Sequence, residues 1–136
     1  MAAELIIMSE LSRLYLIKAE ESLLGAESEF THDRYNNVAN RCYYACFQAA
    51  IAALLAAGIR ARGQWSHEFV QGQFVGVLIN QRHLYETQLR RVLSDNQNAR
   101  EKADYRPELV NATQASRALR RTRTFVAAVR QRGGVA

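Results

Sequence analysis

The sequence predicts an all-α fold, an up-and-down bundle of about five helices. Apolar residues recur with a period of 3.6 residues along most of the chain. Proline, which breaks helices, occurs once, at Pro107. The stretch from Tyr35 to Ala57 is apolar on nearly every side of a helix, and such a helix is buried by its neighbours. With 49% hydrophobic content, we expect residues 1–136 to form one domain with a substantial core.

The first helix is expected from about Ala3 to Ser28, with an apolar face toward the core and several glutamates facing out. Gly25 and the polar stretch Thr31 to Asp33 are expected to mark its end. Either Thr31 or Asp33 would then serve as the N-cap of the next helix.

The central helix, Tyr35 to Ala57, would be roughly 35 Å long, so the other helices must wrap it. Gly58 is expected to end it. Its most apolar part, Tyr43 to Ala57, is shorter than the roughly 20 residues that span a membrane and is interrupted by Gln48. We therefore expect no membrane segment.

A third helix is expected to begin after Ser66 as N-cap, with Trp65 and Val70 in the positions of a hydrophobic staple. Gly72 and Gly76 lie inside it, where each glycine costs about 1 kcal/mol relative to alanine. We expect a close backbone approach to the central helix at these two glycines.

The fourth helix is expected from about Leu84 to Ala103, and the last from Pro107 to the glycines at 133 and 134. The expected buried residues of the fourth helix are Tyr85, Leu89, Val92, Ala99 and Ala103. Those of the last helix are Leu109, Ala112, Leu119, Val126 and Val129. Its arginines are expected to face out, at Arg117, Arg120, Arg121, Arg123 and Arg130.

Charge is divided unevenly along the chain. Residues 1–33 carry seven acidic and two basic residues, whereas the remainder carries 16 basic and six acidic residues. Of the 18 basic residues, 16 are arginine, whose guanidinium donates two parallel hydrogen bonds to a phosphate. The asymmetry indicates an anionic partner or an acidic surface on a second copy; an arginine-rich genome explains the arginine excess equally well.

The two cysteines, Cys42 and Cys46, form no disulfide framework, and the start of the chain lacks a basic leader. Both observations favour a cytoplasmic protein. Cys42 and Cys46 would be half a zinc site, but no second pair of ligands follows, so we expect no metal site. Glycine-rich phosphate loops and HExxH are absent, and we expect no cofactor.

Three groups of residues are candidates for chemistry. Arg41 lies in an apolar helix, so it must either pair with a carboxylate or lie at the mouth of a groove. Together with Tyr44 and Gln48 it forms one polar line along the helix. The alternative is that Arg41 simply ties two helices together. Arg100 and Asp104 are spaced i, i+4, and Tyr105 follows where the helix ends; the alternative is a salt bridge beside a packed tyrosine. His67, after the N-cap, is the imidazole best placed for proton transfer, although it is more often structural.

Three motifs recur in this order in one family. NRCYYACFQAAIAALL occupies Asn40 to Leu55, SHEFV occupies Ser66 to Val70, and REKADY occupies Arg100 to Tyr105. Followed by a terminal helix with alanines and Phe-Val, they resemble the small stand-alone branch of the HEPN superfamily. The resemblance covers about residues 5 to 130.

The resemblance implies a helical bundle that dimerises and a metal-independent endoribonuclease. Such proteins often act as toxins paired with a minimal nucleotidyltransferase antitoxin, or in defence against phage. The signature of the nuclease members is an arginine, a polar residue, three to five others and a histidine. Arg100 and Glu101 match its beginning, but the histidine position holds Asp104 or Tyr105.

By resemblance, Arg100 binds the RNA phosphate. From their positions in the sequence, we expect Arg41 and Tyr44 to contribute to this binding and Asp104, Tyr105 or His67 to move the proton; the use of His67 is our own inference and is not implied by the resemblance. By resemblance, Tyr105 is also the residue that a partner nucleotidyltransferase would adenylylate. Since the histidine is missing, the alternative is a non-catalytic module that binds nucleotide or RNA, or docks a nucleotidyltransferase. A third alternative is a purely structural dimer. In each, the acidic first helix and the basic last helix are expected to meet their opposites on a second copy.

Overall fold

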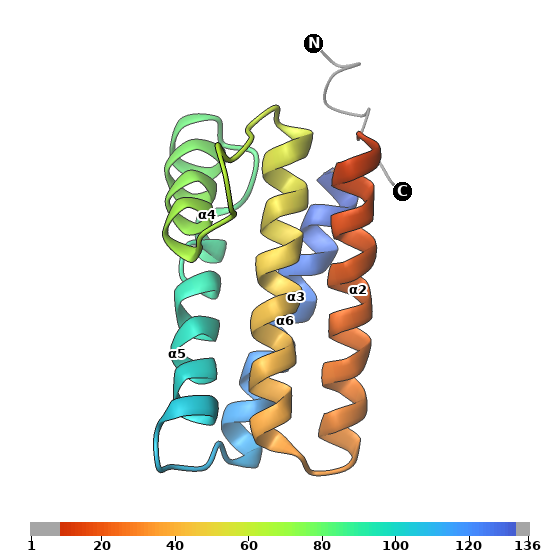
Figure 1. Cartoon of the computed structure of the whole chain (residues 1–136), viewed down its shortest axis with the longest axis vertical. Coiled ribbons are helices and arrows are strands. Elements are labelled where there is room, and N and C mark those ends of the chain that lie inside the picture. Colours follow the sequence, from red (N-terminus) through yellow and green to blue (C-terminus); the bar gives the residue numbers. More distant parts are fainter. Residues whose placement is uncertain (1–8, 133–136) are drawn as a thin grey trace.

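The computed structural model describes residues 9–132, and all regular structure in this range is helical. Five α-helices follow one another: α2 (Glu10–Thr31), α3 (Tyr35–Ala56), α4 (His67–Gln73), α5 (Val92–Tyr105) and α6 (Ala112–Arg132). Between α4 and α5 lie the π-helix η1 (Phe74–Gln81) and the 3₁₀-helix η2 (Thr87–Leu89). The expected all-α bundle is confirmed, and α2, α3, α5 and α6 alternate in direction (Figure 1).

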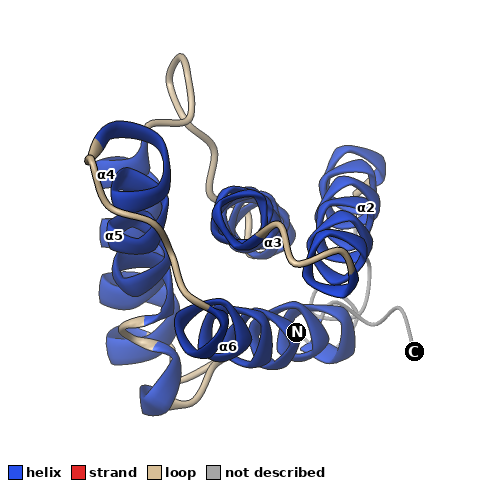
Figure 2. Cartoon of the chain, turned by 90° about the horizontal axis from the view of Figure 1, so that it is seen from below, coloured by secondary structure: helices blue, strands red, loops and turns tan. Residues whose placement is uncertain are grey.

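The apolar helix α3 lies at the centre and contacts α2, α4, η1, α5 and α6. These neighbours lie on three sides of it (Figure 2). None of the helices in residues 9–132 covers the fourth side, so the expectation that α3 is wrapped is met on three sides only. Not every side of α3 is apolar, because it carries the polar residues Asn37 and Arg41, which are exposed to solvent, and this explains why one side stays uncovered. None of the described helices is both long and apolar enough to cross a membrane.

The start of α2 is determined by Ser9. Its hydroxyl accepts a hydrogen bond from the backbone N–H of Ser12 at 3.1 Å, so the helix begins at Glu10. The sequence predicts a helix that runs through Ser9 without a break. This prediction is wrong at Ser9, which is the N-cap and lies just outside α2. Its expected start at Ala3 lies outside the described residues.

The turn from α2 to α3 also differs from the expectation. Gly25 does not end α2, which continues to Thr31; a Cβ on Gly25 would lie 3.5 Å from the Cδ atom of Arg41 on α3. Neither Thr31 nor Asp33 caps α3, because the N-cap is Arg34, whose side chain makes no capping bond. Asp33 instead has a φ of 60°, a left-handed conformation that aspartate tolerates in tight turns.

The connection from α3 to α4 follows the sequence closely. Gly58, with a φ of 83°, comes directly after the C-cap of α3, so the helix ends where predicted. Ser66 caps α4, because its hydroxyl accepts a hydrogen bond from the backbone N–H of Phe69 at 3.1 Å. Trp65 lies beside Phe69 with ring centroids 6.1 Å apart, and Val70 is buried.

The helix that begins as α4 changes its winding at Phe74, where the π-helix η1 starts. Phe74 and Leu78 point into the core. The expected close approach of Gly72 and Gly76 to α3 is wrong, because a Cβ at either position would meet nothing within 4 Å. Both glycines face open space.

The fourth expected helix begins later than predicted. α5 starts at Val92 rather than Leu84, and the 3₁₀-helix η2 occupies part of the interval. Tyr85 and Leu89 are nevertheless buried as expected, because a 3₁₀ turn and an irregular segment also turn apolar side chains inward. Ala99 and Ala103 are half-buried.

The last helix begins at Ala112 and not at Pro107. Asn111 and Gln114 cap it reciprocally: the Gln114 N–H donates to Asn111 Oδ1 at 2.8 Å, and the Asn111 N–H donates to Gln114 Oε1 at 3.1 Å. Leu109 and Ala112, expected inside, are exposed because they precede or begin the helix. The other expected inward residues of this helix are buried, and the expected end at 133–134 lies outside the described residues.

Asn96 on α5 is a buried polar residue that joins three helices. Its Nδ2 lies 3.2 Å from the carbonyl oxygen of Cys42 on α3 and 2.9 Å from Thr122 Oγ1 on α6. Its Oδ1 accepts a hydrogen bond from Arg121 Nε at 2.6 Å, so Arg121 is half-buried and does not face out as expected. Burial raises the pKa of the Cys42 thiol to about 11 and that of Cys46 to about 12, so both stay neutral.

The acidic and basic helices pair within one chain. Arg123 Nε lies 2.8 Å from Glu27 Oε2, and Arg130 forms an ion pair with Glu20. We expected this charge match between two copies, and the structure corrects that expectation, since α2 and α6 are neighbours in the same bundle. Part of the uneven charge of the sequence is thus balanced internally.

Candidate functional site

Arg100 lies among three tyrosine rings, in the C-terminal half of α5. Its guanidinium carbon is 4.4 Å from the ring centroid of Tyr43 and 5.8 Å from those of Tyr44 and Tyr105. Arg100 Nη1 also donates a hydrogen bond to the Tyr44 hydroxyl at 3.3 Å. Because the faces of aromatic rings attract cations, the rings hold the guanidinium in place without neutralising it.

The guanidinium of Arg100 has no carboxylate within ion-pair distance among residues 9–132. The alternative for this pair, an i, i+4 salt bridge, does not form between Arg100 and Asp104; Asp104 accepts a hydrogen bond from Asn40 Nδ2 at 3.0 Å instead. Arg100 Nε is buried and has no hydrogen-bond partner in the described part of the chain. A cation with a free donor is suited to an incoming anion such as a phosphate.

Tyr43 joins Arg100 to His67. The Tyr43 ring stacks on the His67 imidazole with centroids 5.8 Å apart, and its hydroxyl lies 3.4 Å from His67 Nδ1. The other imidazole nitrogen, Nε2, lies 2.8 Å from Gln71 Oε1, one turn further along α4. Burial raises the pKa of Tyr43 and the nearby Arg100 opposes the rise, so the phenol stays neutral. His67 thus reaches Arg100 only through the ring of Tyr43.

Arg41, Tyr44 and Asp104 are linked through Asn40. The Arg41 guanidinium carbon lies 5.4 Å from the Tyr44 ring centroid, and Arg41 Nη2 donates to Asn40 Oδ1 at 2.6 Å. Arg41 is exposed, so it needs no buried carboxylate, and the side-chain amide of Asn40 spans from it to Asp104. Gln48, the third residue of the expected polar line, instead faces α2 and bonds a serine hydroxyl there.

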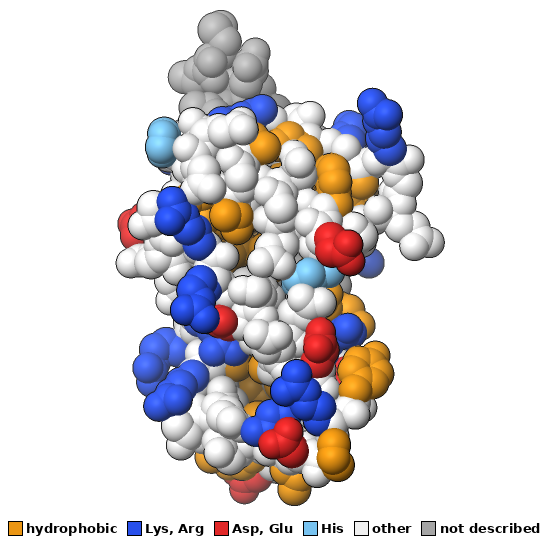
Figure 3. Space-filling view, turned by 90° about the vertical axis from the view of Figure 1, so that its left-hand side faces the viewer, with side chains coloured by type: hydrophobic (Ala, Val, Ile, Leu, Met, Phe, Trp, Pro, Cys, Tyr) orange, Lys and Arg blue, Asp and Glu red, His pale blue; other side chains and the backbone are white. Residues whose placement is uncertain are grey.

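Tyr105 is an exposed member of this group. Its side chain is 72% exposed although its ring lies beside Arg100. Figure 3 shows the face made by α4 and α5, on which lysine and arginine side chains gather in the lower half with acidic ones among them. An anionic strand therefore has access to this end of α5.

The structure brings together the residues that the sequence singled out except Gln48, which lies against α2; the others meet directly or through Tyr43 and Asn40. These two were not predicted as site residues, since Tyr43 belongs to an apolar line of the central helix and Asn40 stands beside Arg41 without a pattern of its own. The adjacent tyrosines were a usable signal, because successive helical residues differ by about 100° and can flank one guanidinium. Within residues 9–132 no group of three His, Cys, Asp or Glu side chains could hold a metal ion.

Comparison with known proteins identifies the family. A family model described as the HEPN domain matches residues 12–132, nearly the whole chain. A search of curated proteins finds no match. The matched range includes every residue of the Arg100 site, from Asn40 to Tyr105. The protein therefore belongs to the HEPN domain family.

Proposed function

We propose that this HEPN protein is an endoribonuclease in which Arg100 binds the scissile phosphate of RNA. The observation that carries the proposal is the Arg100 guanidinium itself: three tyrosine rings surround it, no carboxylate within residues 9–132 pairs with it, and its Nε lacks a hydrogen-bond partner there. A structural arginine in such a place would be paired. HEPN domains often bind RNA, and a phosphate supplies the missing charge and acceptors.

The proposed reaction needs no metal. The RNA 2′-hydroxyl attacks the adjacent phosphorus, the bond to the 5′-oxygen breaks, and the products carry a 2′,3′-cyclic phosphate and a 5′-hydroxyl. Arg100 stabilises the negative charge that develops on the phosphate oxygens. A base takes the proton of the 2′-hydroxyl, and an acid gives one to the leaving 5′-oxygen.

The phenol of Tyr105 is the candidate proton donor to the leaving 5′-oxygen, because it is exposed and lies beside Arg100. His67 is the candidate base, acting once substrate displaces one of its hydrogen bonds to Tyr43 or Gln71. Asp104 would then position the site through Asn40.

The second candidate function is a binding module without catalysis. It is favoured by one observation: both nitrogens of His67 are hydrogen-bonded within the protein, to Tyr43 and Gln71, and neither bonds Arg100. Such a module would hold RNA or a nucleotide at Arg100, or dock a nucleotidyltransferase there, with no turnover.

An RNA-cleavage assay in EDTA separates the two candidates. We expect the wild-type protein to release 2′,3′-cyclic phosphate ends, and Arg100→Ala to lose at least about a hundredfold in rate. Arg91→Ala, which removes an exposed arginine from the other end of the same helix, is the matched control and should cleave normally. Binding of RNA without cleavage by the wild-type protein would establish the binding module, and cleavage by Arg100→Ala at the wild-type rate would contradict the site.

The proposal also includes a biological setting: a cytoplasmic homodimer that acts as a toxin or in phage defence, silenced by a nucleotidyltransferase partner. The phenol of Tyr105 would attack the α-phosphate of ATP and release pyrophosphate, which leaves an anionic adenylyl group beside Arg100. Mass spectrometry after co-expression with such a partner should find AMP on wild-type protein and none on Tyr105→Phe. An unchanged adduct on Tyr105→Phe would place the modification elsewhere.

A further inference from the structure

A cavity of about 500 Å³ opens between the end of α2 and the first half of α6. It is lined by Phe30 from α2 and by Ala112, Thr113, Ser116, Arg117 and Arg120 from α6. None of these residues belongs to the Arg100 site. α6, which supplies most of the lining, lies on the opposite side of α3 from its uncovered face (Figure 2).

The arginines of α6 fall into two groups. Four of them have partners within the chain: Arg121 bonds Asn96, Arg123 bonds Glu27, Arg130 bonds Glu20 and Arg132 bonds the Leu84 carbonyl oxygen. The other two, Arg117 and Arg120, have no side-chain partner among residues 9–132, and these two line the cavity. Spaced i, i+3, they lie on one face of α6. The cavity is thus lined by Arg117 and Arg120, the two arginines of α6 whose side chains have no partner among residues 9–132.

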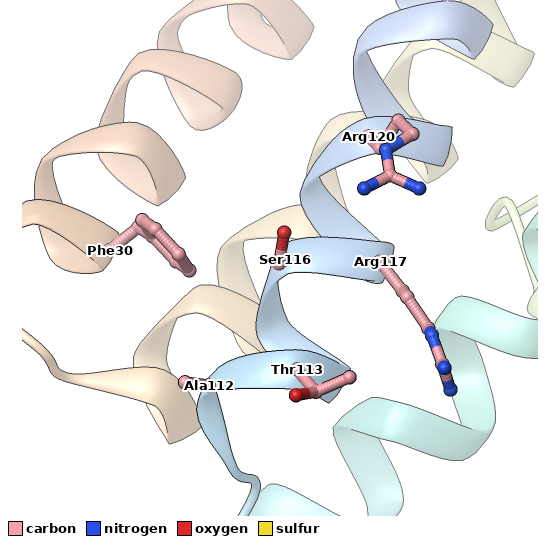
Figure 4. Close-up of a pocket in the computed structure, with 6 residues that line it drawn as sticks. All are labelled: Phe30, Ala112, Thr113, Ser116, Arg117 and Arg120. Carbon is pink, nitrogen blue, oxygen red and sulfur yellow. The ribbon is translucent and has the colours of Figure 1, made fainter.

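The remaining lining residues differ in chemistry along the cavity. Figure 4 shows Phe30 pointing from α2 toward Ser116, with the guanidinium groups of Arg117 and Arg120 on the other side of Ser116. An aromatic ring, a hydroxyl and two guanidinium groups therefore follow one another. A nucleotide has the same sequence of groups, namely a planar base, a ribose and a phosphate.

We propose that this cavity is a second ligand site, separate from Arg100, which binds a nucleotide phosphate. The phosphate is held by Arg117 and Arg120, the ribose lies over the Ser116 hydroxyl, and the base packs on Phe30. The same chemistry is offered by a free mononucleotide and by the 5′-phosphorylated end of an RNA.

Isothermal titration with AMP, adenosine and inorganic phosphate tests the site. AMP should bind wild-type protein more tightly than either fragment. The double variant Arg117→Gln/Arg120→Gln should weaken AMP binding by about a hundredfold, since each lost charge-assisted hydrogen bond is worth about a factor of ten. The matched control Arg60→Gln/Arg62→Gln removes the same charge from two exposed residues of the α3–α4 loop and should change the dissociation constant less than about twofold.

Further variants keep the test independent of the Arg100 site and of folding. In an Arg100→Gln background, which removes the phosphate-binding arginine of the other site, the Arg117→Gln/Arg120→Gln pair should still weaken AMP binding by about a hundredfold, and Ser116→Ala, which favours the helix, should weaken it severalfold. A 5′-phosphorylated oligoribonucleotide that competes with AMP identifies an RNA end as the ligand, and one that does not compete identifies a free nucleotide. Equal weakening by the control pair, or adenosine binding as tightly as AMP, overturns the proposal.

Discussion

At the residue scale, the polar side chains of Asn96 and Arg100 differ in how completely their hydrogen bonds are satisfied. Asn96 is fully satisfied, with hydrogen bonds to α3 and α6, and it ties three helices together. Arg100 is satisfied only in part: among residues 9–132 its Nη1 bonds the Tyr44 hydroxyl, whereas its buried Nε has no hydrogen-bond partner. Unmet hydrogen bonds inside a protein are costly, so Asn96 contributes to stability, whereas the unpaired Nε of Arg100 supports our proposal that this residue binds a phosphate.

Replacement of Asn96 by alanine should reduce the free energy of unfolding by about 2–4 kcal/mol, because it leaves a cavity and removes the acceptor of Arg121. Urea unfolding followed by circular dichroism measures the change. Asn98→Ala, at an exposed position of the same helix, is the control and should lie within about 0.5 kcal/mol of wild type. A loss at Asn96 as small as at Asn98 would show that the buried network adds no stability.

At the scale of elements, capping residues and glycines in the sequence determine some of the helix ends. Ser66 and Gly58 act as the sequence predicts, since a cap bond and a left-handed glycine need only neighbouring residues. Gly72 and Gly76 do not act as predicted, because they face open space beside the change from α4 to the π-helix.

The glycines give a paired prediction of opposite sign. Gly72→Ala should raise the free energy of unfolding by about 0.5–1 kcal/mol, because alanine favours the helix and its methyl group meets no neighbour. Gly58→Ala should lower it by about 1 kcal/mol or more, because its φ of 83° strains any residue with a Cβ. Thermal or urea unfolding of both variants tests this, and a shift of the same sign in both would contradict it.

At the scale of the whole molecule, some charged residues pair with one another within the chain and others are left exposed. The ion pairs between α2 and α6 lie within one bundle, so they do not argue for a dimer. The face left for a second copy in our proposal is the uncovered side of α3 (Figure 2), and Arg41 of α3 is exposed. Two further exposed apolar residues are close to it, since Leu109 lines a hollow with Asn37 of α3 and the Tyr105 ring lies beside Arg100.

We expect a homodimer in sedimentation velocity runs that persists in Glu20→Gln/Glu27→Gln, because both glutamates are engaged within the chain. Arg41→Glu should weaken the dimer at least tenfold through like-charge repulsion between the two copies. Dissociation of the glutamate variant would move the interface to α2 and α6. An unchanged dimer in Arg41→Glu would exclude the uncovered side of α3.

Much of the fold was predictable because its signals are local. The 3.6-residue period, the single proline and the apolar central helix predict the bundle, and the order of the helices follows. The starts of α5 and α6 were not predictable to the same degree: Leu84 begins a periodic stretch that the chain breaks with a 3₁₀ turn, and Pro107 precedes a better cap at Asn111. The candidate site was predictable as a set of residues but not as a set of contacts.

The sequence by itself determined that the chain is helical, that a helix from Tyr35 to Ala57 lies at its centre and that Arg100, Asp104 and Tyr105 share one helix end. Only the tertiary structure decided which partners these residues take. Asp104 is four residues from Arg100 yet bonds Asn40, 64 residues away, and Arg100 is left to the tyrosines of α3. The physical reason is that spacing along a helix only allows a contact, whereas packing against a second helix selects among the contacts allowed.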